Sequence, residues 1–423
     1  MSGGQVDVIP DSDFRLLQNG KVDRSQSFGQ KAVSSLERTL AGTISLPEAI
    51  ARAHSEIASW PDYSPTPLVQ MTGLAAELAV EQILYKDEGR RFGLSSFKAM
   101  GGGYAVSQIV ARHIMQSEAV GDVNSARLLS GDHRDLASQV TVTCATDGNH
   151  GRAVAWAANQ FGCRSVVYMA SIVSPFREDA MVSLGAEVVR SRGNHEAAAA
   201  ECRAVARERG WFVVSETENA TEPAIAADTF AGYSMIMSEV ATQLPGAKLP
   251  THVFVQAGVG GLAATAALFC GLQWLADRPK LVVVESDQAD CILKSIEIGQ
   301  PVAITGDLDT VMAGLAAGEV SNYAWSVLSV GADCCMAISD TAAIATMRML
   351  ADSPFGDQPV IGGESGVASL AAAIMAARDN AARRHLDITA ESHILTIGTE
   401  GATDPEVYQR LVGKTPEAVA SRP

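Results

Sequence analysis

The sequence lacks any Cys-x-x-Cys pair, although it contains seven cysteines. An odd number of cysteines without this spacing indicates neither a disulfide framework nor a zinc site. We therefore expect reduced thiols, no bound metal and a cytoplasmic protein. The P-loop, the HExxH helix and the GxSxG turn are also missing. Kinase, zinc-protease and α/β-hydrolase interpretations therefore lose the motifs on which they depend.

Positive charge is scarce. The 423 residues include 32 Lys and Arg against 48 Asp and Glu, a net charge of −16. Nucleic acids and anionic membrane surfaces repel so acidic a protein, so neither is an expected partner. The N-terminus carries acids where a signal peptide has a basic start, so export is not expected. One uncharged run, residues 253–276, has the length of a membrane span, but its strand-like start and its glycines favour a strand, a turn and a buried helix.

The length suits two domains, or one large α/β domain with an insertion. Short β-branched runs alternate with helical stretches, which predicts a parallel, doubly wound α/β fold. The first forty or so residues are polar and predict an irregular arm, and residues 218–229 predict a loop crossing between two halves. The expected strands are residues 81–86, 140–146, 165–170, 186–191, 211–216, 252–256, 280–285 and 393–398. The expected helices include residues 150–161, 175–184, 195–209 and 261–276.

Lys98 is the first candidate for chemistry. It follows a serine pair, residues 95–96, either member of which can cap a starting helix, and three glycines follow at 101–103. The positive end of a helix dipole disfavours an added proton, so a lysine here can act as a nucleophile or a base. A lysine near a helix start is usually a solvated charge, but residues 92–106 are apolar and nearly uncharged.

The segment after the strand at residues 140–146 reads Asp-Gly-Asn-His-Gly, residues 147–151. Turn chemistry accounts for the glycines and Asn149, but it requires neither Asp147 nor His150. A strand-to-helix turn aims backbone N–H groups and a helix N-terminus at one point, which favours an anion. The alternative interpretation is an ordinary turn whose polar side chains have no part in binding or catalysis.

A second glycine loop follows the strand at residues 252–256. Gly258, Gly260 and Ala263 satisfy G-x-G-x-x-A, and Glu285 ends the next strand as a ribose-binding acid would. A dinucleotide site is therefore one interpretation, and a phosphate site of some kind is the safer one. Thr399 ends the last expected strand, where ligands of open α/β folds bind, although a simple turn is the alternative there.

Together these stretches resemble the fold-type II pyridoxal-phosphate enzymes, which share the fold of tryptophan synthase β. Within this class they resemble the diaminopropionate ammonia-lyases most. The resemblance covers residues 65–404. It implies two doubly wound parallel-sheet domains with the cofactor between them. The larger contains residues 1–92 and 215–423, including an arm at 1–45, and the smaller, residues 93–214, is inserted in it. The motifs that carry the resemblance are YSPTPL, KDEGRRFGLSSFK, ATDGNHGRAVAW, QAGVGGLA, VMAGLAAGE, GGESG and TEGATD.

The resemblance implies pyridoxal 5'-phosphate as the cofactor and gives roles to particular residues. Lys98 is implied as the lysine that joins covalently to the cofactor, and Asp147 as the acid that handles the α-proton. Glu216 stands where the family has an Asp near the substrate side chain. The implied cofactor contacts are Phe97 beside the ring, Asn149 at the phenolic oxygen, Gly258, Val259, Gly260 and Gly261 at the phosphate, and Thr399 at the pyridine nitrogen. The implied contacts to the substrate carboxylate are Thr146, Gly148 and His150.

The implied reaction is the α,β-elimination of ammonia from the small amino acid 2,3-diaminopropionate, giving pyruvate and ammonia. Lys98 and Asp147 would then be two bases on opposite faces of the substrate, which would allow both enantiomers to react. The alternatives are a related enzyme acting on serine, threonine or 3-hydroxyaspartate, a nicotinamide-dependent dehydrogenase, and a silent ligand-sensing relative. A homodimer is expected from the resemblance.

Overall fold

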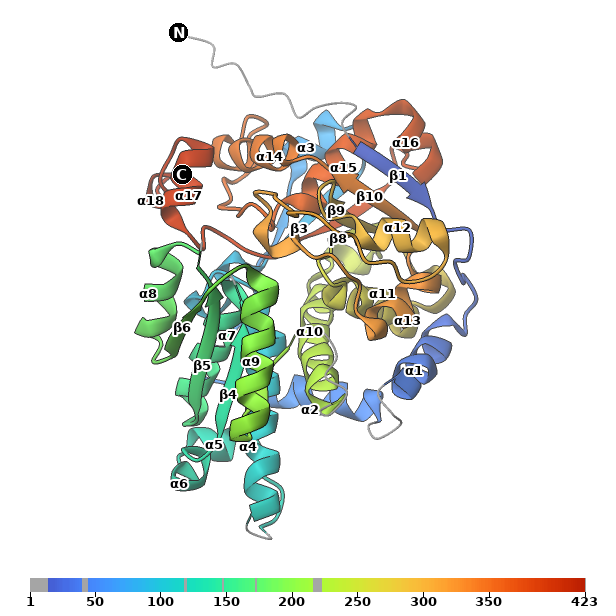
Figure 1. Cartoon of the computed structure of the whole chain (residues 1–423). Coiled ribbons are helices and arrows are strands. Elements are labelled where there is room, and N and C mark those ends of the chain that lie inside the picture. The colour runs from blue at the N-terminus through green and yellow to red at the C-terminus, as the bar shows by residue number, and fades with distance from the viewer. Residues whose placement is uncertain are drawn as a thin grey trace. The chain divides into compact units, whose positions relative to one another are not determined.

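The computed structural model describes residues 14–39, 45–117, 120–146, 148–171, 173–215 and 223–422. The chain forms two compact units, each built on its own β-sheet (Figure 1). The first unit is Met1–Thr39, Thr66–Arg90 and Met237–Pro423, and the second is Leu40–Pro65 and Arg91–Ile236. The smaller domain expected from the sequence, residues 93–214, lies within the second unit, which extends beyond it at both ends.

The sheet of the first unit has seven strands in the order β1-β10-β9-β8-β11-β3-β2. The five inner strands are parallel, and the two edge strands are antiparallel to their neighbours. Because β8 and β11 are adjacent and parallel, their carboxyl ends lie at the same edge of the sheet. The strands are β1 (Phe14–Gln18), β2 (Leu68–Gln70), β3 (Gln82–Asp87), β8 (His252–Gln256), β9 (Lys280–Ser286), β10 (Cys334–Ile338) and β11 (His393–Gly398).

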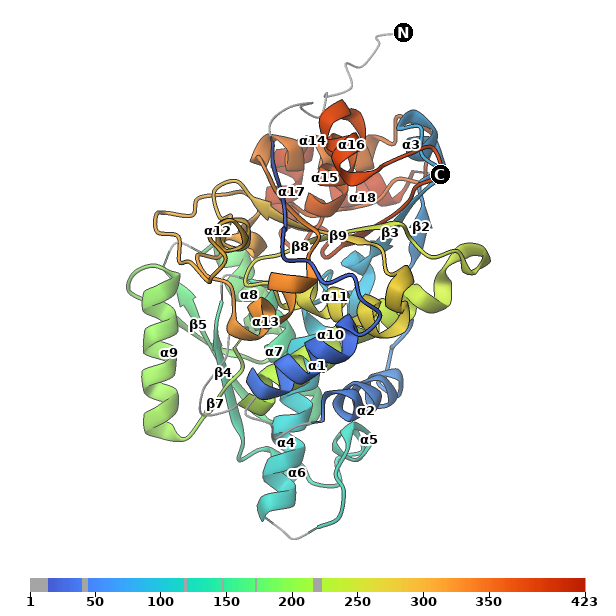
Figure 2. The ribbon, with the colours of Figure 1, turned by 90° about the vertical axis from the view of Figure 1, so that its right-hand side faces the viewer.

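Helices cover both faces of this sheet (Figure 2). Alternate residues of a strand point to opposite faces, and Phe254, Val282 and Met336 belong to the core on the side of α14 and α15. The helix α15 is buried nearly all round, which explains its almost wholly apolar sequence. The helices are α1 (Phe28–Thr39), α3 (Thr72–Glu77), α11 (Gly261–Gln273), α12 (Cys291–Ile298), α13 (Asn322–Gly331), α14 (Asp340–Asp352), α15 (Ala368–Arg378), α16 (Asn380–Leu386), α17 (Pro405–Val412) and α18 (Pro416–Ala420).

The second unit has a four-stranded parallel sheet in the order β6-β5-β4-β7. The helix α9 packs on one face of β4 and β5, and α7 packs on the other (Figures 1 and 2). The strands are β4 (Thr141–Ala145), β5 (Arg164–Ala170), β6 (Glu187–Ser191) and β7 (Phe212–Val213). The helices are α2 (Leu46–Ala58), α4 (Tyr104–Ser117), α5 (Ser125–Leu129), α6 (Arg134–Ala137), α7 (Asn149–Phe161), α8 (Pro175–Ser183) and α9 (His195–Arg209), and α10 (Pro223–Gln243) begins here and ends in the first unit.

All eight expected strands are present, and the doubly wound α/β class is confirmed. Two expectations are wrong, and one strand was not expected. The N-terminal segment is not irregular throughout, because residues 14–39 include β1 and the amphipathic helix α1. Of the expected loop at residues 218–229, residues 218–222 lie outside the described residues, and residues 223–229 belong to α10, since Pro223 is compatible with a first helical turn. The strand β10 was not expected, because its cysteines, methionine and alanine carry no β-branched signal.

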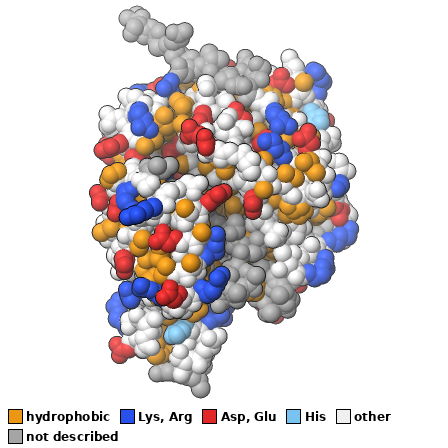
Figure 3. All heavy atoms as spheres, in the orientation of Figure 1, with side chains coloured by type: hydrophobic (Ala, Val, Ile, Leu, Met, Phe, Trp, Pro, Cys, Tyr) orange, Lys and Arg blue, Asp and Glu red, His pale blue; other side chains and the backbone are white. Residues whose placement is uncertain are grey.

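The uncharged run at residues 253–276 forms most of β8 followed by α11, as expected. Within the described ranges, no helix has both the length and the apolar character needed to cross a bilayer. On the face drawn in Figure 3, acidic and basic side chains are interspersed. The excess of negative charge is therefore not gathered in one stripe on that face.

Candidate active site

Lys98 stands at the start of a helix, as the sequence predicts. It precedes the π-helical turn Ala99–Gly103, which runs directly into α4. The backbone N–H of Lys98 donates to Oγ of Ser96 at 3.4 Å. A Cβ placed on Gly101 would lie 2.5 Å from the ring of Tyr233, so only glycine lets α10 approach this turn. The Phe97 ring packs 4.9 Å from that of Tyr233, and Nζ of Lys98 lies 5.0 Å from the centroid of the Phe97 ring.

The loop after β4 is ordered by Thr146. Its N–H donates to the carbonyl of Tyr168 at 3.0 Å, and its hydroxyl accepts from the N–H groups of Gly148 at 3.1 Å and Gly151 at 3.4 Å. A Cβ on Gly151 would lie 2.4 Å from Cγ2 of Thr146, so close packing requires glycine there. Asp147 lies outside the described residues. The hydroxyl of Thr146 is thus engaged in shaping the turn that the sequence assigns to the substrate carboxylate.

Asn149 is the first residue of α7, and His150 follows it inside the core. Nε2 of His150 lies 2.8 Å from the carbonyl of Val214, which can only accept, so Nε2 carries the hydrogen. A Cβ on Gly102 would lie 3.5 Å from the imidazole. His150 therefore joins the start of α7 to the end of β7 and to the turn after Lys98.

Arg177, on α8, was missed in the sequence. A Cβ on Gly148 would lie 3.6 Å from Nη1 of Arg177, so its guanidinium faces the loop that is expected to bind an anion. The signal that could have identified it is a basic residue in the first turn of the helix that follows β5. Glu216, expected near the substrate side chain, lies outside the described residues.

In the first unit, the glycine loop after β8 is a tight turn. Gly260 has a φ of +96°, and a Cβ there would lie 2.9 Å from Cβ of Ala324. A Cβ on Gly258 would lie 3.1 Å from the carbonyl oxygen of Gly314. The carbonyl of Val259 accepts from the N–H of Ser321 at 3.0 Å, which fixes the turn. The first amides of α11 have no partner within the helix and lie at its positive end, so they suit a phosphate group.

Thr399 lies directly after β11, at the same edge of the sheet, and is buried. Its hydroxyl lies 2.7 Å from Nε2 of Gln256, the last residue of β8. The order of the strands, rather than proximity in sequence, brings these two residues together. The first unit thus presents a buried hydroxyl and a tight glycine turn at one sheet edge.

Glu285 is not the ribose-binding acid of a dinucleotide site. It is fully buried, and its two oxygens accept from the N–H groups of Ile292 and Leu293, each at 2.8 Å. Burial raises the pKa of Glu285 to about 8. Both oxygens are therefore used to cap α12, and the dinucleotide interpretation is wrong.

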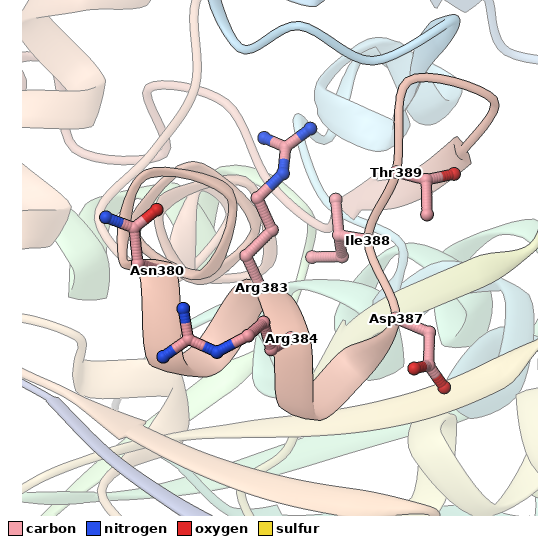
Figure 4. Close-up of a pocket in the computed structure, with 6 residues that line it drawn as sticks. All are labelled: Asn380, Arg383, Arg384, Asp387, Ile388 and Thr389. Carbon is pink, nitrogen blue, oxygen red and sulfur yellow. The ribbon is translucent and has the colours of Figure 1, made fainter.

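A surface hollow of about 370 Å³ lies in the first unit, away from these residues (Figure 4). It is formed around α16 and the segment that leads into β11, so it lies at the opposite edge of the sheet from Thr399. The guanidinium of Arg383 donates to the carbonyls of Leu78, Ala79 and Ala377 and is a structural group. The lining residues are Asn380, Arg383, Arg384, Asp387, Ile388 and Thr389.

Taken separately, each unit contains groups that suit part of a cofactor with a phosphate, a ring nitrogen and an aldehyde. The first unit provides a turn too tight for side chains at Gly258 and Gly260 and a buried hydroxyl at Thr399. The second unit provides the amine of Lys98 and the side-chain amide of Asn149, each at the start of a helix. A hydroxyl beside a pyridine nitrogen and amides around a phosphate are suitable hydrogen-bond partners for such a molecule.

Comparison with known proteins agrees with this arrangement. The pyridoxal-phosphate-dependent enzyme family matches residues 60–397, and the chain belongs to this family. The chain is 35% identical over 365 residues to the diaminopropionate ammonia-lyase of Salmonella typhimurium, which covers 83% of this chain and 89% of the relative.

Solved structures of a diaminopropionate ammonia-lyase are also similar to this chain. The holo form of diaminopropionate ammonia-lyase from Escherichia coli superposes with a TM-score of 0.82 at 29% identity, covering 96% of this chain and 98% of the other. The same enzyme in complex with D-serine superposes with a TM-score of 0.81, at the same identity and coverage. The expectations of a fold-type II enzyme, of pyridoxal phosphate as cofactor and of a carbon–nitrogen lyase are confirmed.

Proposed function

We propose that this enzyme eliminates ammonia from 2,3-diaminopropionate and so produces pyruvate and ammonia. The observation that carries the proposal is the similarity to the Salmonella typhimurium ammonia-lyase over most of both chains. The neutral hydroxyl at Thr399 supports it, because a partner that does not protonate the pyridine nitrogen limits charge storage in the ring. Elimination is then favoured over transamination.

Particular residues would hold the cofactor. The amides of residues 258–261 would bind the phosphate, the hydroxyl of Thr399 would donate to the pyridine nitrogen, Asn149 would donate to the phenolic oxygen, and Phe97 would lie beside the ring. Lys98 would provide the amine that joins to the aldehyde. When bound, pyridoxal phosphate supplies an electron sink that acidifies the Cα–H bond of an amino acid.

Proton transfer is the task of Lys98 and Asp147. The two bases take the Cα proton from opposite faces, which allows both enantiomers of the substrate to react. The β-amine is a poor leaving group unless it is protonated, and a positioned acid typically contributes about 10²–10⁴-fold to such a step. Glu216 is the group assigned to the β-amine, and the loop at residues 146–150, with Thr146, Gly148 and His150, binds the carboxylate.

The test is turnover of each candidate amino acid by the enzyme reconstituted with pyridoxal phosphate. Diaminopropionate should yield two molecules of ammonia for each pyruvate, whereas serine should yield one, and serine and threonine should be turned over more slowly. Lys98→Ala should abolish turnover and the borohydride-reducible imine. Asp147→Asn should reduce turnover of one enantiomer far more than the other. Faster turnover of serine than of either isomer of diaminopropionate would contradict the proposed substrate.

We further propose that the enzyme is a homodimer of the cytoplasm. The seven cysteines are unpaired, which suits a reducing compartment. Leu275 is about half exposed beside the contacting rings of Phe269 and Trp274, an apolar surface of the kind that subunit interfaces cover. Light scattering of the purified holoenzyme measures the oligomeric state directly.

A further inference from the structure

Gln256 is a buried amide at the end of an otherwise apolar inner strand. It is only 3% exposed. Its Nε2 lies close to three oxygens: the carbonyls of Ser365 at 3.1 Å and Gly366 at 3.0 Å, and the hydroxyl of Thr399 at 2.7 Å. Its Oε1 has no hydrogen-bond partner among the described residues. A buried polar atom without a partner destabilises the fold, so the amide calls for an explanation beyond packing.

The two carbonyls determine which end of the amide faces Thr399. A carbonyl oxygen only accepts, so the NH₂ end of Gln256 must face Ser365 and Gly366. The flipped amide would set Oε1 against two other oxygens, all of them acceptors. Thr399 therefore faces the NH₂ group as well. This group has two hydrogens for three nearby oxygens, so one hydrogen is shared, and the shortest of the three contacts, 2.7 Å, is the one to Thr399. Because an amide NH₂ group does not accept hydrogen bonds, the Thr399 oxygen must be the acceptor, and its own hydrogen points away from Gln256.

The carbonyls themselves are held in place. The N–H of Ser365 donates to Oε1 of Glu400 at 2.9 Å, and its hydroxyl accepts from the N–H of Gly314 at 2.9 Å. A Cβ on Gly366 would lie 2.4 Å from the carbonyl oxygen of Glu400. The loop that carries both carbonyls is therefore packed against the segment after β11 and cannot easily turn away to accept the opposite amide orientation.

We propose that Gln256 is a positioning residue that determines the direction in which the Thr399 hydroxyl points its hydrogen. By occupying the hydroxyl oxygen as a donor, it leaves the hydroxyl hydrogen to donate to the pyridine nitrogen of the cofactor. This inference rests on the role proposed above for Thr399. A threonine hydroxyl has one hydrogen and two lone pairs, so accepting from Gln256 leaves that hydrogen available to the ring nitrogen. A ring nitrogen that accepts from Thr399 would be hydrogen-bonded without carrying a proton of its own.

The experiment measures the ¹⁵N chemical shift of the pyridine nitrogen in labelled pyridoxal phosphate bound to the full-length enzyme. This shift reports a hydrogen bond to the nitrogen whether or not the enzyme turns over. Gln256→Met removes the donor at similar length. It should move the shift toward that of a pyridine without a hydrogen bond, in the same direction as Thr399→Val, and the double variant should show no further change. We expect kcat to fall about tenfold with KM little changed.

Gln256→Leu is the second variant, for the case in which Gln256→Met does not fold. Its apolar side chain carries no N–H group, so the same change in shift is expected. Thr396→Val is the matched control: Thr396 is a buried threonine of β11 whose hydroxyl donates to the carbonyl of Leu84. It should leave the shift unchanged.

The outcomes separate the two hypotheses. If Thr399→Val moves the shift and the folded Gln256 variants do not, the positioning role of Gln256 is wrong and the role of Thr399 stands. If neither position affects the shift, Thr399 is not the partner of the pyridine nitrogen and both hypotheses fail. A change caused equally by Thr396→Val would also overturn the inference, because the effect would then be a general disturbance of the strand.

Discussion

At the scale of single residues, polar groups at the ends of inner strands perform different tasks. Lys86 is the last residue but one of β3 and lies in a buried cluster, where its amine donates to Oε2 of Glu239 at 2.6 Å and to the carbonyl of Thr66 at 2.8 Å. Glu285 caps a helix, whereas Gln256 faces Thr399. The sequence shows each residue type at a strand end, but not which partner it meets. This is why a structural cap was interpreted as a ribose-binding acid.

The cap at Glu285 leads to a prediction about pH. Burial raises the pKa of Glu285 from 4.5 to about 8, so between these values the folded protein keeps a proton that the unfolded chain has lost. The contribution of this carboxyl group to the free energy of unfolding is fully present below about pH 4.5 and is lost as the pH rises toward 8. The free energy of unfolding then falls by at most about 1.4 kcal/mol per pH unit. Glu285→Gln removes this titration. Its stability relative to the parent should therefore improve as the pH rises from 5 to 8.

Urea denaturation at four pH values in that range measures the effect. Glu285→Gln loses one acceptor for the amides of Ile292 and Leu293. The variant protein should therefore also be destabilised by an amount that does not depend on pH. Glu297→Gln, at an exposed glutamate of the same helix, controls for the loss of one carboxylate. A difference between Glu285→Gln and the parent that does not change with pH would show that the buried carboxyl group does not titrate in this window.

At the scale of elements, the pattern of apolar and β-branched residues predicted four of the five inner strands of the first unit and several of the helices that cover them. The helix α1 was missed because its polar composition concealed an apolar face formed by Phe28, Ala32, Val33 and Leu36. Spacing of three and four residues was the available signal. What the sequence could not show is how closely α1 approaches α11. A Cβ on Gly29 would lie 2.6 Å from the carbonyl carbon of Gly271.

This contact predicts that Gly29→Ala destabilises the first unit. The atom that the new methyl group meets belongs to the backbone, so a helix must shift rather than a side chain turn. Such overpacking costs about 1–3 kcal/mol, which exceeds the gain in helix propensity of at most about 1 kcal/mol. Equilibrium denaturation measures the difference. Gly20→Ala, with nothing within 4 Å of the added Cβ, is the matched control and should be nearly neutral. Equal stability of the two variants would contradict the close helix contact.

At the scale of the whole molecule, the sequence predicted two parallel-sheet domains but not the strand order. Residues 258–261 and Thr399 are far apart in the chain, and they follow neighbouring strand ends because β11 pairs with β8. Strand order depends on which apolar faces pack together, which periodicity along one strand does not reveal. The pairing of Gln256 with Thr399 was therefore beyond sequence analysis, whereas Lys98, the loop after β4 and the glycine loop could each be identified from local patterns.

The proposed contacts to the cofactor lead to a prediction about the stability of the whole chain. If the first unit supplies the contacts to the phosphate and the ring nitrogen, Lys98→Ala should still bind pyridoxal phosphate without a covalent bond. Binding to the folded state alone stabilises it by about 2.7 kcal/mol when the free ligand is at 100 times its Kd. The Tm of Lys98→Ala should therefore rise with the concentration of pyridoxal phosphate, although no imine forms.

The phosphate is the part of the ligand that should matter most in this measurement. Pyridoxal without its phosphate should raise the Tm of Lys98→Ala much less, and inorganic phosphate should compete with pyridoxal phosphate. Adding Gly260→Ala should remove most of the effect, because residue 260 has a positive φ and its Cβ would lie 2.9 Å from Ala324. If pyridoxal and pyridoxal phosphate raised the Tm equally, the turn at residues 258–261 would not be the phosphate site, and the binding of the cofactor would depend mainly on other residues of the chain.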